Sequence, residues 1–65
     1  MATPITRRAQ RSLQLTAYHA SLHATGEQEL TLRALLDAHT AGHITTSDAR
    51  AAVIALRKTQ QARAA

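Results

Sequence analysis

Large apolar residues recur along the chain at intervals of three and four positions, which is the spacing of an amphipathic helix. No stretch alternates apolar and polar residues in the manner of a half-buried strand. Residues that begin and end helices lie between the periodic segments, so local chemistry and periodicity agree. The pattern predicts an all-α protein with three helices, near residues 4–24, 27–41 and 46–61, and no strand.

Capping residues mark the start of the first two predicted helices. Thr3 is a good N-cap, and Pro4 fits the first helical position, where its missing N–H group is not needed. Thr25 and Gln28 have the spacing of a capping box, in which each side chain bonds to the backbone of the other residue. We therefore expect the first helix to end near Ala24 and the second to begin directly after the cap.

The segment 30–56 has the pattern of a helical hairpin. Gly42 can take the left-handed conformation that closes a helix, and Thr45 with Asp48 has the spacing of a second capping box. Ala38 and Gly42 also have the spacing of a DNA-binding helix-turn-helix, but Asp48 is polar where that motif has a buried aliphatic residue. We therefore interpret the segment as a capped hairpin around which the chain is organised.

The predicted core is thin, even for a chain of 65 residues. About half of the apolar residues are alanine, and Tyr18 is the one aromatic residue. Chains of this size bury only about 60% of the surface that their unfolded form exposes, and without cysteine no disulfide can stabilise the fold. We predict a single small helical domain over residues 1–65, frayed at 1–3 and 62–65, that forms a dimeric helical bundle.

Each of the first two predicted helices has more than one apolar face, so each is expected to contact more than one neighbour. We expect the homodimer to use one face of the first helix and the leucine-rich face of the second. A large apolar residue also interrupts the basic face of the third helix. The side chains predicted to contact a protein partner or a second copy are Leu15, Tyr18, Leu22, Leu32, Leu35, Leu36, His39 and Ile54.

Basic residues give the clearest functional signal. The formal net charge is +4, and arginine strongly outnumbers lysine. A planar guanidinium group binds phosphate through two parallel hydrogen bonds, whereas a solvated helix face needs no such preference. The residues predicted to bind nucleic acid are Arg7, Arg8, Arg11, Arg50, Arg57 and Lys58.

We therefore predict a small cytoplasmic regulatory protein that binds nucleic acid. The alternative is a protein-binding inhibitor or adaptor, of the kind that phages and mobile elements often encode. Such a protein would use large apolar residues surrounded by arginines as its contact surface. A large apolar patch left exposed on the basic faces favours the second class, and a bare arginine surface favours the first.

Several other functions lack the residues they need. With four acidic residues, no cysteine and no glycine-rich phosphate loop, the chain is not expected to be an enzyme. His19 and His23 have the spacing of a metal-binding pair, but two ligands are too few, so we predict no metal and no cofactor. No stretch approaches the roughly 20 apolar residues of a membrane helix, so we expect no membrane partner.

Overall fold

The computed structural model describes residues 7–64, and this part of the chain contains three α-helices. They are α1 (Arg7–Leu22), α2 (Gly26–Thr40) and α3 (Thr46–Ala64). No strand occurs in the described range, so the predicted all-α class and the number of helices are confirmed. The predicted start of the first helix at Thr3 and Pro4 lies outside the described residues.

Two helix ends differ from the predicted ones by two or more residues, and both ends of α2 lie one residue earlier than predicted. α1 ends at Leu22 rather than Ala24, because the chain must become extended at Thr25 (ψ 170°) to cap α2. The backbone N–H groups of His23 and Ala24 accordingly bond three residues back, at 3.3 and 3.4 Å. α3 continues past Gln61 to Ala64 through residues that favour helix. Fraying of the chain ends stays a prediction.

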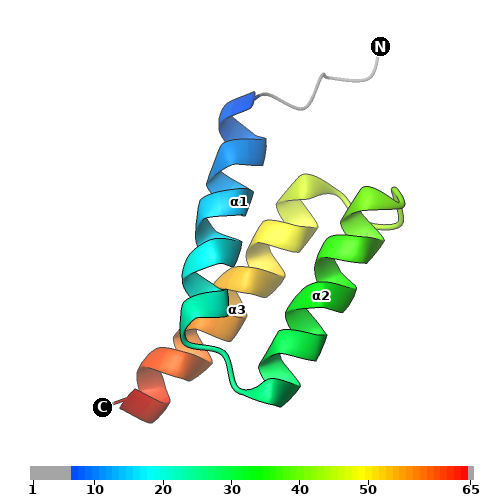
Figure 1. Cartoon of the computed structure of the whole chain (residues 1–65). Helices are drawn as coiled ribbons and strands as arrows, with labels where there is room; N and C mark the ends of the chain where they lie inside the picture. Colours follow the sequence, from blue (N-terminus) through cyan, green and yellow to red (C-terminus); the bar gives the residue numbers. More distant parts are fainter. Residues whose placement is uncertain (1–6, 65) are drawn as a thin grey trace.

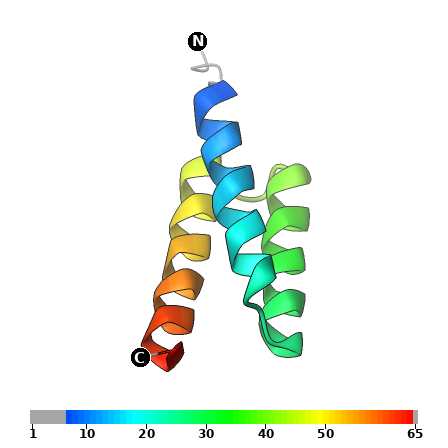
Figure 2. The same ribbon diagram turned by 60° about the vertical axis from the view of Figure 1, so that its left-hand side comes forward.

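The three helices form a bundle in which each helix contacts the other two (Figure 1). α1 and α3 run in the same direction, and α2 runs in the opposite direction between its two turns (Figure 1). Seen from the side, α1 lies over the gap between α2 and α3 (Figure 2). The most extensive packing joins α1 to α3, so the largest helix interface lies between the first and last helices of the chain.

Both predicted capping boxes are present. Thr25 Oγ1 accepts a hydrogen bond from the backbone N–H of Gln28 at 3.2 Å, and Gln28 Oε1 accepts one from the backbone N–H of Thr25 at 3.0 Å. Thr45 and Asp48 form the same pair of bonds at 3.0 and 3.4 Å. Asp48 is exposed, as its role as a cap requires, and not buried as in a helix-turn-helix.

Gly42 ends α2 in the way the sequence predicts. Its φ of +82° lies in the left-handed region that glycine adopts without steric cost. The backbone N–H of His43 donates to the carbonyl of Ala38 at 2.9 Å, and that of Gly42 donates to the carbonyl of His39 at 3.1 Å. These two bonds form a Schellman motif, which satisfies carbonyl groups that the helix itself leaves unpaired.

The core is small, and half of its residues are alanine. Because alanine fills little volume, the helix axes can approach closely. Partly buried large residues, Leu35, Leu36, Ile44 and Leu56, pack around the core. The buried apolar residues are Leu13, Ala17, Ala20, Leu32, Ala49 and Val53.

A buried glutamine ties the three helices together at one end of the bundle. Gln60 is 8% exposed, and its Nε2 donates to the carbonyl oxygen of Ala20 at 2.9 Å and to Gln28 Oε1 at 3.4 Å. Its Oε1 accepts a hydrogen bond from Arg57 at 3.0 Å. The side chain thereby pairs a carbonyl at the end of α1 that has few partners within the helix.

Replacing Gln60 with alanine is expected to lower the free energy of unfolding by about 1–3 kcal/mol, because it removes one of the two donors to the buried Ala20 carbonyl and the bonds to Gln28 and Arg57. The matched control is Gln61→Ala, since Gln61 is the adjacent glutamine and is exposed. Its effect should stay within about 0.5 kcal/mol. Urea unfolding followed by circular dichroism measures both values. Equal stability of the two variants would show that the Gln60 bonds do not hold the helices together.

Candidate nucleic-acid interface

Charge is segregated by helix in this structure. α1 contains three arginines and no acidic residue. After Asp48 in its first turn, α3 contains only basic charged residues, whereas α2 contains three acidic residues and a single arginine. Since α1 packs against α3, their positive charges lie on adjoining helices. We define the α1–α3 basic face as the six residues predicted from the sequence: Arg7, Arg8, Arg11, Arg50, Arg57 and Lys58.

The cations of this face are not neutralised within the described part of the chain. No ion pair links any two of the described side chains. Arg50 and Arg57 each donate one hydrogen bond, to the neutral side chains of Ser12 and Gln60, both at 3.0 Å. All six residues except the partly buried Arg57 are exposed. The face therefore keeps its full positive charge for an anionic partner.

The three arginines of α1 line one hollow, and Arg8 also lines a second pocket beside α3. Arg7 and Arg11 continue, at intervals of three and four residues, into Leu15, Tyr18 and Leu22, and we call these five residues the α1 outer stripe. The stripe lies opposite the buried residues of α1. Its apolar members are 54%, 60% and 59% exposed, respectively, so more than half of each large side chain is in contact with solvent.

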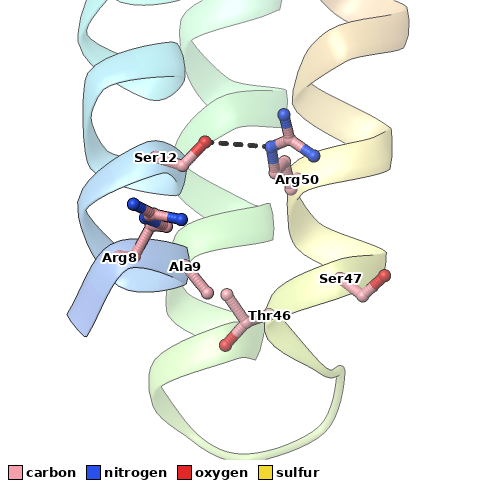
Figure 3. Close-up of a pocket in the computed structure, with 6 residues that line it drawn as sticks. All are labelled: Arg8, Ala9, Ser12, Thr46, Ser47 and Arg50. Atoms are coloured by element: carbon pink, nitrogen blue, oxygen red, sulfur yellow. Dashed lines mark hydrogen bonds between the residues drawn. The ribbon is translucent and has the colours of Figure 1, made fainter. Parts of the chain in front are cut away.

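Arg8 also lines an open pocket of about 400 Å³ between α1 and α3 (Figure 3). We call this the α1–α3 pocket. Arg50 enters it from α3, and its Nε donates to Ser12 Oγ of α1 at 3.0 Å. A neighbouring hollow along α1 shares Arg8 and Ser12 with it. The residues that line the α1–α3 pocket are Arg8, Ala9, Ser12, Thr46, Ser47 and Arg50.

The leucine-rich face predicted as a partner surface on the second helix is largely used inside the chain. Leu32 is 4% exposed and belongs to the core, while Leu35 and Leu36 are partly buried against it. His39 is partly buried too, with Nε2 at 2.8 Å from Thr46 Oγ1. These residues are therefore left out of the surfaces proposed below, because their contacts are with α1 and α3.

Two residues that the sequence analysis did not single out have notable positions. Leu30 is 70% exposed on the side of α2 away from Leu32, and the 3.6-residue period places it there. Gln60 lies about one helical turn beyond the partly buried Leu56 and two turns beyond the buried Val53. This spacing could have identified Gln60 as a buried residue. Ile54, predicted as a contact residue between arginines, is partly buried.

Groups for other chemistry are sparse in the described range. His19 and His23 are exposed, and no group of three or more His, Asp or Glu side chains among residues 7–64 could hold a metal ion. Within the same residues, no helix combines the length and the apolar character that crossing a membrane requires. Among the described residues, the α1–α3 basic face and the α1 outer stripe are therefore the surfaces whose residue types indicate a binding partner.

Comparison of the chain with protein-family models, with curated proteins and with solved structures finds no match. The function proposed below therefore rests on the chemistry of these surfaces alone.

Proposed function

We propose that the protein is a small, non-enzymatic regulator that binds nucleic acid through the α1–α3 basic face. The segregation of charge carries this proposal: seven cations lie on two adjoining helices, while α2 holds three of the four acidic residues. Nucleic acid presents a dense row of phosphates, and a cation that contacts one releases a condensed counterion. A surface of arginines without carboxylates is favourable for such contacts.

The binding proposed here is directed at phosphate rather than at base edges. Base readout by a helix needs a row of side chains that reach into the major groove. The partly buried Arg57 bonds to Gln60, and Arg50 bonds to Ser12, so both are held close to the protein surface. We therefore expect affinity to depend strongly on salt and weakly on nucleotide sequence.

Arg8→Ala compared with Arg33→Ala tests the proposal. Both residues are exposed arginines and both changes remove one positive charge, but Arg33 lies on the acidic helix α2. We expect Arg8→Ala to weaken binding of a labelled 20-base-pair duplex by roughly threefold or more, because it removes a cation that contacts a phosphate. Arg33→Ala should cause less than about half of the loss in binding free energy that Arg8→Ala causes. Fluorescence anisotropy at 50 mM salt measures both.

Equal losses in the two variants would mean that net charge alone drives binding. No detectable binding by the unaltered protein at 50 mM salt would reject the proposed function itself.

We further propose that the protein forms a homodimer through the apolar members of the α1 outer stripe, Leu15, Tyr18 and Leu22, which leaves Arg7 and Arg11 to the α1–α3 basic face. Three large apolar side chains are exposed there, next to a core that is half alanine. The hairpin-centred organisation of this dimer stays a prediction.

The exposure of Leu15, Tyr18 and Leu22 also supports the second candidate, a protein-binding inhibitor or adaptor. A tyrosine between leucines with arginines beside them has the composition of a protein-binding surface. Capture from a nuclease-treated lysate distinguishes this candidate from the first. One host protein retained by the unaltered chain and lost with Tyr18→Ser, but not with Leu30→Ser, would favour the adaptor over the nucleic-acid regulator.

A further inference from the structure

We propose that the α1–α3 pocket binds a single phosphodiester group of the nucleic-acid backbone between Arg8 and Arg50. This inference rests on the proposed function and names the place where the backbone is held. The pocket is lined by two arginines and two serines with available donors, and no carboxylate lines it. The hydroxyl of Thr46 is already bonded to His39, and the carboxylate of Asp48 bonds to the backbone of Thr45 at the start of α3.

Arg50 is held in place for this role by Ser12. Its Nε donates to Ser12 Oγ at 3.0 Å, which leaves the four N–H groups of the two terminal nitrogens without a partner among residues 7–64. Because the guanidinium group is already fixed, less side-chain freedom is lost when an anion binds. Ser12 accepts in this bond, so its own O–H can still donate to the same anion.

Arg8 supplies the second cation from the other helix (Figure 3). It forms no hydrogen bond or ion pair through its side chain with other described residues. Two guanidinium groups that line one pocket without a carboxylate repel each other, and an anion between them removes that repulsion. The volume of about 400 Å³ and the open shape admit a phosphate that is still attached to a nucleic-acid strand.

The comparison of Arg50→Lys with Arg63→Ala distinguishes a specific phosphate site from non-specific electrostatic attraction. Lysine keeps the charge of Arg50 but lacks the Nε–H donor to Ser12 and the planar fork. Arg63 lies on the same helix, is exposed and does not line the pocket. We expect Arg50→Lys to weaken duplex binding at least fivefold and Arg63→Ala to weaken it about twofold or less. Circular dichroism confirms that both variants keep their helices.

Ser12→Ala tests the positioning of Arg50. It removes the acceptor for Nε without changing the charge, so we expect a loss of about threefold in affinity with an unchanged salt dependence. The variant Ser21→Ala, at another serine of α1, is the control and should bind as the unaltered protein does. An unchanged affinity for Ser12→Ala would overturn the role of this bond.

Titration with inorganic phosphate, with sodium chloride at equal ionic strength as the reference, tests the pocket without nucleic acid. Saturable changes in the NMR signals of Arg8, Ser12, Ser47 and Arg50, together with the loss of duplex affinity in Arg50→Lys, would support the site. If the duplex binds but Arg50→Lys retains full affinity and phosphate shifts no pocket signal, the site is wrong while the proposed function stands. If phosphate shifts these signals and no duplex binds, the nucleic-acid backbone is not the source and the proposed function fails.

Discussion

Replacing Leu32 with alanine is expected to lower the free energy of unfolding by about 2–5 kcal/mol. A small single core rarely supplies more than about 3–5 kcal/mol in total, so a large share of the chain should be unfolded at 25 °C. Leu32 is the one buried residue that α2 contributes to the core, and three of the other five buried apolar residues in the described range are alanines. Because alanine side chains cannot extend into the space, the cavity stays open. The helical signal at 222 nm, followed during urea titration, measures the loss.

Leu30→Ala is the matched control for this prediction, since it makes the same chemical change on the same helix. Leu30 is 70% exposed, compared with 4% for Leu32. Its replacement should change the free energy of unfolding by no more than about 0.5 kcal/mol. A loss as large as that of Leu32→Ala would show that Leu30 is buried in an oligomer or that α2 faces the core differently.

The second large effect is expected at the α1 outer stripe. Tyr18→Asp should convert a homodimer at micromolar concentration into a monomer, because it removes the largest side chain of the stripe and buries a carboxylate in the interface. Central aromatic residues of interfaces contribute about 2–4 kcal/mol, so the dissociation constant should rise at least about 30-fold. Sedimentation velocity over a range of concentrations measures it.

Leu30→Asp places the same carboxylate at an equally exposed position on α2 and should leave the dimer intact. The fold should survive both changes, since Tyr18 is 60% exposed within a single chain. A monomer mass for the unaltered protein at micromolar concentration, with a melting temperature that does not vary with concentration, would contradict the dimer.

The sequence was sufficient to predict the three helices because the residues that begin and end each helix lie within a few positions of its ends. Thr25 with Gln28 and Thr45 with Asp48 form capping boxes over three residues, and Gly42 ends α2 through its own backbone conformation. Such features need no knowledge of the tertiary fold.

The choice between the two faces of α2 could not be made in the same way. Leu30 and Leu32 both follow a helical period of apolar residues, and only packing against α1 and α3 decides that Leu32 is buried. The bond from Gln60 to Ala20 joins residues 40 positions apart, so local reasoning does not find it.

The candidate site was also only partly predictable. The sequence identified Arg8 and Arg50 as basic residues on different helices, but their shared pocket depends on the parallel packing of α1 and α3. The helical rotation of about 100° per residue places Arg8 within about 20° of Leu15, so a helical projection puts Arg8 on the same side of α1 as Leu15 and does not reveal its contact with α3.

The dependence of duplex affinity on salt tests the central proposal most directly. Each phosphate contact on B-DNA contributes about −0.9 to the slope of the logarithm of the association constant against the logarithm of salt concentration. If Arg8, Arg50 and neighbouring cations of the α1–α3 basic face each contact a phosphate, the slope should lie between about −2 and −5. A measured slope in this range, reduced by about 1 in Arg50→Ala, is the predicted result. A slope near zero, or one that Arg50→Ala leaves unchanged, would contradict it.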